Sequence, residues 1–168
     1  LYNTTKVVSG YDKSSLKKIN FLYKEVFQSI YSAQSLEIAE MSKLVENSYR
    51  SVNIGLVNEI KKICFALKID FNKVLDTAAT KPFGFNLFRP GPGVGGHCIP
   101  IDPIFLTWIA KKNNQKAKFI ELARNINIQI TNWIISKICT INKKANDKTC
   151  RLKILIVGLS YKADVNDL

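Results

Sequence analysis

Cys98 is the residue best suited to chemistry in this sequence, and it lies in the stretch GPGVGGHCIP at positions 91–100. A cysteine thiolate is a strong nucleophile near neutral pH when its surroundings favour the ionised form. Asp102 follows four residues later and could act as a base if both side chains reach one cavity. The other interpretation is that Cys98 is a small buried residue beside a structural turn. His97 could pair with Cys98, although the side chains of neighbours in sequence usually point apart. It could also be a residue of the turn.

The glycines before Cys98 predict a loop that brings backbone N–H groups close to a ligand, because glycine permits sharp turns and close approach. Residues 91–96 also match the GxGxxG pattern of dinucleotide sites. That pattern must follow a strand and open a helix, whereas FNLFRP precedes it here and Pro100 and Pro103 follow it. We therefore expect a ligand-binding loop at this place and no dinucleotide site.

A second polar group is predicted on a helix, where Lys43, Asn47 and Arg50 are spaced to share one face. A lysine and an asparagine held one turn apart could both donate hydrogen bonds to a developing oxyanion. The same spacing would also suit a solvated polar stripe.

The elements that must position these residues follow from hydrophobic periodicity. Two short strands at 5–10 and 29–33 flank a helix at 12–27, which together indicate a β-α-β unit. Further helices are predicted at about 36–67, 70–79, 103–112 and 117–142. A polar linker at 143–149 precedes a buried strand at 151–162, which is typical of the opening of a new α/β domain.

Composition indicates a soluble globular chain without a membrane helix, since 46% of the 168 residues are hydrophobic and 23% are charged. The net charge is +12, but the lysines are scattered, so we expect an anionic small-molecule ligand and no nucleic acid. The four cysteines lack zinc-site spacing, so no metal is expected, and they indicate reduced thiols in the cytoplasm. The remaining three are interpreted as small buried residues: Cys64, Cys139 and Cys150.

Four segments together resemble the UDP-glucose/GDP-mannose dehydrogenase family, in the family's order along the chain. They are AEMSKLVENSYRSVNIGLVNE (39–59), AATKPFGFNLFRPGPGVGGHCIPIDPIFLTW (78–108), FIELARNIN (119–127) and ILIVGLSYKADVNDL (154–168). The loop GPGVGGHCIPIDP is most similar to the branch that acts on UDP-N-acetylhexosamines, the UDP-N-acetylglucosamine and UDP-N-acetylmannosamine 6-dehydrogenases. His97 and Ile101 depart from the pattern of the UDP-glucose branch.

The resemblance implies oxidation of the sugar C6 alcohol to a carboxylate in two steps, each giving a hydride to NAD. Cys98 falls at the nucleophile that attacks the intermediate aldehyde to form a thiohemiacetal. Oxidation of the thiohemiacetal then gives a thioester, which water hydrolyses. Lys43 and Asn47 fall at the residues that stabilise the oxyanion and help to orient water. Asp102 falls at the aspartate that assists proton transfer and hydrolysis.

The resemblance also implies a UDP-sugar substrate, wrapped by the segment from Phe85 to Gly95 and held by an aromatic–lysine pair whose ammonium suits a diphosphate. The implied binding residues are Phe85, Asn86, Phe88, Arg89, Gly91, Gly93, Gly95, Tyr161 and Lys162. The residues that bind NAD are expected mostly outside this chain.

The expected fold is a mostly α central domain with a long helix, flanked by partial α/β, Rossmann-like domains. By the resemblance, residues 1–34 are the end of an NAD-binding domain, 35–148 a central dimerisation and catalytic domain, and 149–168 the start of a UDP-binding domain. We expect a homodimer built on the long helix, and no membrane insertion. The chain alone is expected to be inactive, because the groups that hold NAD would be missing.

The function implied by the resemblance is NAD-dependent oxidation of a UDP-N-acetylhexosamine at C6 for surface polysaccharide synthesis. The alternatives are a UDP-glucose or GDP-mannose 6-dehydrogenase, and a non-catalytic module for sugar-nucleotide binding or dimerisation. The joint presence of the four catalytic candidates argues against a non-catalytic module: Lys43, Asn47, Cys98 and Asp102.

Overall fold

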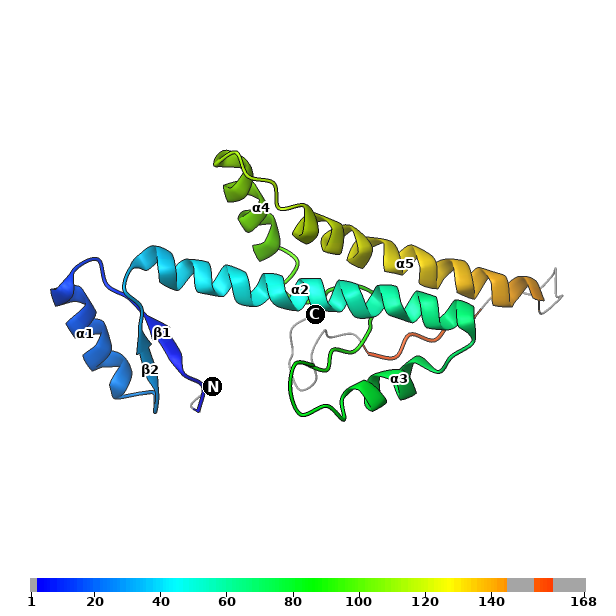
Figure 1. The fold of residues 1–168 in the computed structure, drawn as a ribbon, viewed down its shortest axis with the longest axis horizontal. Coiled ribbons are helices and arrows are strands. Elements are labelled where there is room, and N and C mark those ends of the chain that lie inside the picture. The colour runs from blue at the N-terminus through cyan, green and yellow to red at the C-terminus, as the bar shows by residue number, and fades with distance from the viewer. Residues whose placement is uncertain (1–2, 145–152, 159–168) are drawn as a thin grey trace. The chain divides into compact units, whose positions relative to one another are not determined.

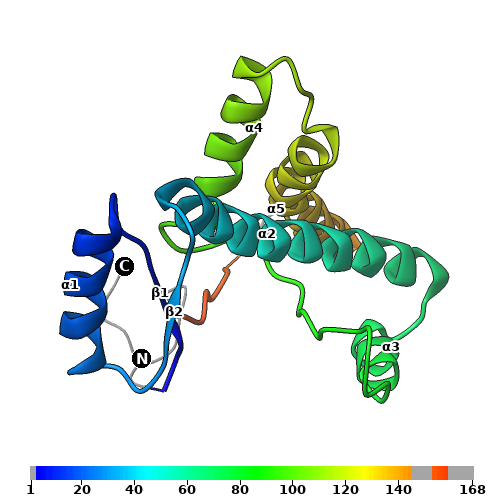
Figure 2. The same ribbon diagram turned by 60° about the vertical axis from the view of Figure 1, so that its left-hand side comes forward.

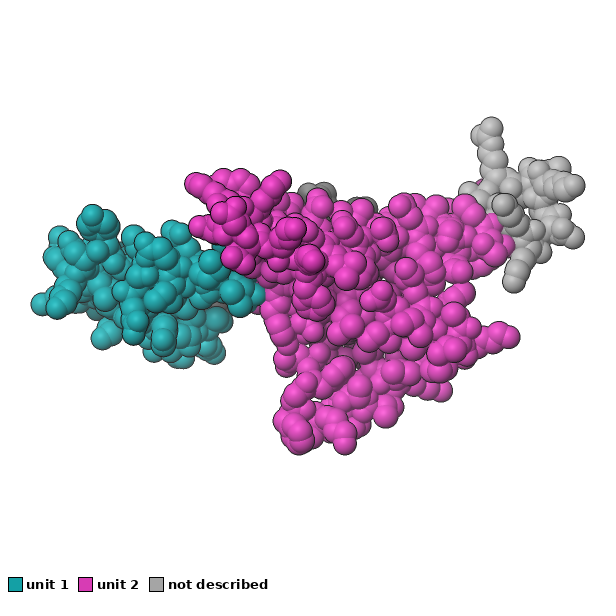
Figure 3. Space-filling view, turned by 45° about the horizontal axis from the view of Figure 1, so that its top comes forward, with its two compact units in different colours: residues 1–46 teal, residues 47–168 magenta. Residues whose placement is uncertain are grey.

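A computed structural model describes residues 3–144 and 153–158, and this part of the chain contains five helices and a two-stranded sheet (Figure 1). The chain divides into two compact units, residues 1–46 and 47–168, which Figure 3 colours separately. The predicted fold class, mostly helical with one long helix, is confirmed. The domain limits expected at 34/35 and 148/149 stay predictions.

The first unit contains a small parallel sheet covered by one helix. Strands β1 (Lys6–Val8) and β2 (Ile30–Ser32) pair with Val7 opposite Tyr31, and α1 (Lys13–Lys24) connects them. Asp12 caps α1, because its carboxylate accepts a hydrogen bond from the Ser15 N–H at 2.7 Å. Hydrogen bonds from the backbone and side chain of Ser15 lower the pKa of Asp12. The predicted β-α-β unit is therefore confirmed.

The frame of the second unit consists of α5 (Lys118–Lys144) and the part of α2 (Leu36–Leu67) that begins at Asn47. Their contacts follow the same order along both helices. Gly55 meets Ala123, Asn58 bonds to Asn127, and the rings of Phe65 and Trp133 lie edge to face at 5.3 Å. The two helices therefore run in the same direction (Figures 1 and 2).

Gly55 permits a close approach of these helices. A Cβ atom at this position would lie 3.1 Å from the carbonyl oxygen of Ala123 and 3.4 Å from its Cα. Glycine in a helix interior costs about 1 kcal/mol relative to alanine. The close contact with α5 supplies the packing reason for placing a glycine there.

Because parallel helices cannot be joined by a short turn, the chain crosses over between them through residues 68–117. This crossover contains α3 (Phe71–Ala78), a long irregular loop, and α4 (Asp102–Lys112). Helix α3 lies on another side of α2 from α5, as the two ribbon views agree (Figures 1 and 2). There it forms an apolar core with α2 that consists of Val57, Cys64, Phe71 and Leu75. Ile60 and Phe88 pack against this core.

Residues 153–158 form neither helix nor strand, and their side chains are exposed. A buried strand was expected across them, but a strand is stable only when its N–H and C=O groups pair with a neighbour. The described residues contain no strand paired with this segment. The rest of the region expected to open a UDP-binding domain, 149–152 and 159–168, lies outside the described residues. No helix within 3–144 is long and apolar enough to cross a membrane.

The α2–α5 contact predicts how the helix pair responds to a larger residue. In the complete protein, Gly55→Val should lower the free energy of unfolding by about 1–3 kcal/mol, because a branched side chain forces α5 away. Ala66→Val adds the same side chain at an exposed position of α2 and should change it by less than about 0.5 kcal/mol. Urea unfolding followed by circular dichroism measures both. Equal stability of the two variants would contradict this account.

Candidate active site

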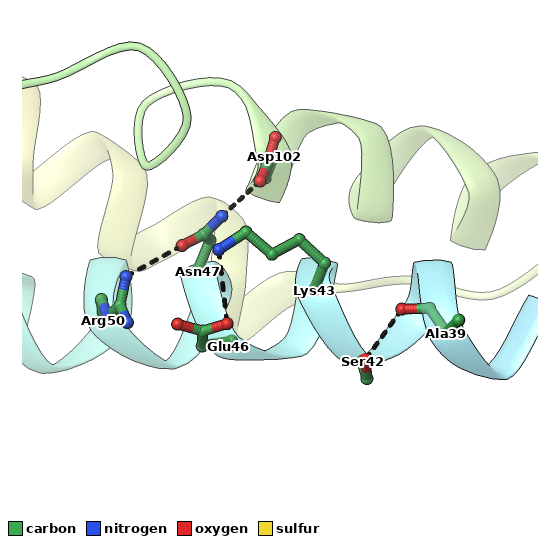
Figure 4. Close-up of polar contacts among 7 residues, drawn as sticks. All are labelled: Ala39, Ser42, Lys43, Glu46, Asn47, Arg50 and Asp102. Carbon is green, nitrogen blue, oxygen red and sulfur yellow. Dashed lines mark hydrogen bonds and ion pairs between the residues drawn. The ribbon is translucent and has the colours of Figure 1, made fainter. Parts of the chain in front are cut away.

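Asn47 and Asp102 form the polar contact at the centre of the candidate site. Asn47 is 1% exposed, and its Nδ2 donates a hydrogen bond to Oδ2 of Asp102 (Figure 4). On its other side, Arg50 Nη1 donates to Oδ1 of Asn47 at 3.3 Å. The amide is thus fixed at both ends. Two residues 55 apart in sequence, both candidates from the sequence, are brought together.

Lys43 lies one turn before Asn47 in α2, and its ammonium pairs with Glu46 Oε2 at 3.3 Å (Figure 4). Its side chain is 55% exposed, so this ion pair is solvated and weak. The ammonium can therefore exchange Glu46 for another anionic partner at small cost. Lys43 belongs to the first unit, so its approach to Cys98 stays a prediction.

Cys98 is exposed and lies at the point where the loop turns into α4. Its carbonyl accepts hydrogen bonds from the N–H groups of Ile101 at 3.0 Å and Asp102 at 2.8 Å. This turn sets where Asp102 stands relative to the cysteine. The thiol is not the small buried residue that the alternative interpretation required.

The other cysteines divide between the core and the surface. Cys64 is buried among the apolar residues that join α2 and α3, as expected. Cys139 is exposed on α5, so its interpretation as a buried residue is wrong. The described chain supplies no neighbour that covers that side of α5. Cys150 lies outside the described residues.

The glycine loop is held at its start by groups that the sequence did not point to. The Gly91 N–H donates to Asn58 Oδ1 at 3.1 Å, and Thr131 Oγ1 donates to the Pro92 carbonyl at 2.6 Å. Gly93 has φ of +127°, and a Cβ atom there would lie 3.0 Å from the Asn127 carbonyl oxygen. Only glycine fits this position without strain.

Two buried asparagines connect this loop to both long helices. Asn58 is fully buried and donates through Nδ2 to Asn127 Oδ1 at 3.1 Å. Asn127 is 6% exposed and donates through its own Nδ2 to the Ser51 carbonyl at 2.8 Å. Buried amides are stable only when their groups are paired. Asn58 and Asn127 lie within the segments 39–59 and 119–127 that resemble the family, but nothing in those segments indicates that the two side chains pair.

The residues expected to bind a nucleotide sugar lie before and within this loop. Phe88 packs against the Tyr49 ring at 5.8 Å, and Asn86 Nδ2 donates to the Tyr49 hydroxyl at 2.6 Å. Arg89 forms an exposed ion pair with Asp76 at 3.2 Å. The side chain of Phe85 and the backbone at Gly95 are exposed. Tyr161 and Lys162 lie outside the described residues.

A cavity of about 350 Å³ lies on the α5 side of the loop, between Gly93, Val94, Pro103, Arg124 and Thr131. Neither Cys98 nor Asp102 lines it, although Pro103, the residue after Asp102, does. Within residues 3–144 and 153–158, no cluster of histidine, cysteine or carboxylate side chains could hold a metal ion.

The backbone at Gly93 gives a testable consequence. Gly93→Ala in the complete protein should lower the free energy of unfolding by about 1–3 kcal/mol, because alanine is strained at this φ and its Cβ meets Asn127. Gly91→Ala is the matched control, since the nearest atom to its Cβ is 3.6 Å away and its N–H is kept. It should cost less than about 1 kcal/mol. Thermal unfolding compares the two variants, and a larger loss at Gly91 would refute this assignment.

Comparison with known proteins places this arrangement in a family. Residues 37–129 match the central domain of the UDP-glucose/GDP-mannose dehydrogenase family. A UDP-N-acetyl-D-mannosamine dehydrogenase of Methanococcus maripaludis is 38% identical over 99% of this chain, and one of Escherichia coli is 34% identical over 100%. The chain spans 38% and 40% of the lengths of these two relatives.

Solved structures give the same result. The UDP-N-acetyl-mannosamine dehydrogenase of Staphylococcus aureus matches with a TM-score of 0.78 and 34% identity, covering 98% of this chain and 36% of that one. A UDP-D-ManNAc dehydrogenase of Pyrococcus horikoshii matches with a TM-score of 0.79 and 28% identity, covering 87% of this chain and 34% of that one. The chain therefore belongs to the UDP-glucose/GDP-mannose dehydrogenase family.

Proposed function

We propose that this chain is the central part of an NAD-dependent dehydrogenase that oxidises C6 of a UDP-N-acetylhexosamine to the carboxylate. UDP-N-acetylmannosamine is the first substrate to test, because the relatives named above carry that name. The observation that carries the proposal is the hydrogen bond from Asn47 to Asp102, which ties the turn after Cys98 to α2.

Cys98 is the proposed nucleophile. Its thiolate adds to the aldehyde carbon made by the first oxidation, and the carbonyl electron pair moves to oxygen to give an oxyanion, which takes up a proton to become the thiohemiacetal. Loss of a hydride and the hydroxyl proton gives a thioester. Water then adds to the thioester and releases the carboxylate and the free thiol. Exposure of Cys98 at the entry to α4 makes this attack possible.

Asn47, Lys43 and Asp102 have separate roles in this proposal. The amide of Asn47 carries two hydrogens, so its bond to Asp102 leaves one to donate to the oxyanion. The Lys43 ammonium is the second oxyanion donor. Asp102 takes the proton of the attacking water, and its contact with Asn47 fixes where that carboxylate stands.

NAD would supply the hydride acceptor for both oxidations. The glycines at 91–96 do not suit it, because no strand leads into them and α4 begins only at Asp102. No residue of this chain is assigned to the cofactor. The β-α-β unit of residues 6–32 is the proposed edge of the domain that binds it.

The UDP-sugar is proposed to lie against the segment from Phe85 to Gly95, with Tyr161 and Lys162 as further contacts. Asn86 and Arg89 offer donors at the start of this segment, and their present partners Tyr49 and Asp76 are themselves exposed. Exchange of such exposed partners for a diphosphate or sugar hydroxyl carries little desolvation cost.

A homodimer is proposed on the exposed side of α2. Leu56 and Ile63 occur at heptad spacing, and each is about half exposed (50% and 53%). Such a stripe suits a second copy of the same helix, and removal of this apolar surface from water would stabilise the assembly.

The proposal is tested with the complete enzyme, a panel of UDP-sugars and NAD. Cys98→Ser should lower net formation of the uronic acid by at least about 10³-fold, because the hydroxyl lacks the nucleophilicity of a thiolate. Cys139→Ser is the control, since that thiol is exposed but lies on α5 away from the loop. Absorbance of NADH and chromatography of the acid are the measurements. Unchanged acid formation in Cys98→Ser would favour a non-catalytic module or another nucleophile.

Asp102→Asn tests whether Asp102 acts as a base or only as the hydrogen-bond partner of Asn47. The asparagine can still accept the bond from Asn47 through its amide oxygen, but it cannot take a proton. Turnover should fall by about 10²–10⁴-fold with KM changed much less. Steady-state kinetics on the best UDP-sugar measure both constants, and a change confined to KM would assign Asp102 to substrate binding alone.

A further inference from the structure

The start of the glycine loop is held at three successive residues by two side chains and one backbone carbonyl, none of which belongs to the proposed chemistry. Asn58 accepts from the Gly91 N–H at 3.1 Å and Thr131 donates to the Pro92 carbonyl at 2.6 Å. The Asn127 carbonyl closes on Gly93 so tightly that no Cβ fits. Helices α2 and α5 therefore hold this end of the loop from two sides.

The loop lies beside a cavity, so packing supports it on part of its surface only. A cavity of about 350 Å³ opens beside the Gly93–Asn127 contact and is lined by Val94, Arg124 and Ile128 among others, so the loop is close-packed on α5 along only part of its length. In a close-packed interior, shape would fix the backbone. Beside a cavity, directional hydrogen bonds such as those of Asn58 and Thr131 add the restraint that packing on that side does not supply.

The other end of the same segment is fixed by the same helix. Asn47 bonds to Asp102, and Asp102 closes the turn that begins at the Cys98 carbonyl. Asn47 and Asn58 are about three turns apart, so they share one face of α2. Cys98 thus lies between two attachment points on one rigid helix. A shift at either point changes where the thiol stands.

We propose that Thr131, together with the Asn58–Asn127 pair, forms a positioning device that places Cys98 for capture of the aldehyde. The inference rests on the proposed function of Cys98. None of the three residues is assigned a contact with the substrate. Loss of the anchor lets the loop move, thiohemiacetal formation slows, and more of the aldehyde leaves before the thiol adds to it.

Thr131→Val tests this inference in the complete enzyme, because it removes the hydroxyl from an exposed position while keeping the side-chain shape. Thr131→Ser keeps the hydroxyl and should restore function. Thr140→Val is the matched control, since its hydroxyl bonds only within α5, to the Ser136 carbonyl at 2.8 Å. The measurements are kcat with UDP-N-acetylmannosamine, NADH formed per sugar consumed, and aldehyde trapped with hydroxylamine.

We expect Thr131→Val to lower kcat by about three- to tenfold, the factor that corresponds to one neutral hydrogen bond. The NADH formed per sugar should fall from two towards one as trapped aldehyde rises. Thr131→Ser and Thr140→Val should keep the wild-type ratio, and melting temperatures of all variants should stay close to that of the wild type. A purely structural role would lower stability without changing the ratio.

The outcomes separate this inference from the proposed function. An unchanged NADH-to-sugar ratio in Thr131→Val, in an enzyme whose wild type is active and whose Cys98→Ser variant is not, overturns the positioning role alone. Equal behaviour of the serine and valine variants also overturns it, because the hydroxyl would then be irrelevant. No NAD reduction by the wild type, or full acid formation by Cys98→Ser, overturns the proposed function first.

Discussion

The hydrogen bond between Asn58 and Asn127 is the contact on which the second unit depends. Both amides are buried where α2 and α5 meet, and each is paired: Asn58 with Gly91 and Asn127, Asn127 with Asn58 and Ser51. A buried amide that loses a partner carries a desolvation penalty of about 1–3 kcal/mol. The Gly91 N–H of the loop therefore pairs a buried amide oxygen of α2, while Asn58 and Thr131 hold the loop in place.

This mutual dependence explains why the candidate site is built on α2. One face of the helix is polar and buried, with Asn47, Ser51 and Asn58 along it. Another side is apolar and packs with α3 into a core that includes Cys64 and Leu75. Phe88 joins that core just before the loop begins. The helix that carries the site is thus packed on two of its sides, and such support keeps the geometry of a functional site accurate.

The sequence indicated much of this arrangement. Helical periodicity predicted α2 over the range observed, and the spacing of Lys43 and Asn47 correctly placed them one turn apart. The sequence did not indicate which partners the buried polar residues would choose. Asn58 and Asn127 are 69 residues apart, and pairing at that distance depends on the parallel direction of two helices, which local periodicity does not encode. The prediction that Cys139 is buried is wrong for a similar reason. Cysteine is a residue type that is usually buried, but no described residue covers that side of α5. Helical periodicity also gives no sign that Gly55 packs directly against the backbone of α5.

The polar face of α2 also has a consequence for synthesis on the ribosome. Asn127 emerges 69 residues after Asn58, which at typical elongation rates is a delay of roughly 3–14 seconds. During that time α5 does not yet exist to cover this face of α2. An apolar face would be exposed to other nascent chains over the same interval. A face of asparagine and serine is instead hydrated by water until α5 arrives, so the most deeply buried part of this helix is also safe to leave uncovered.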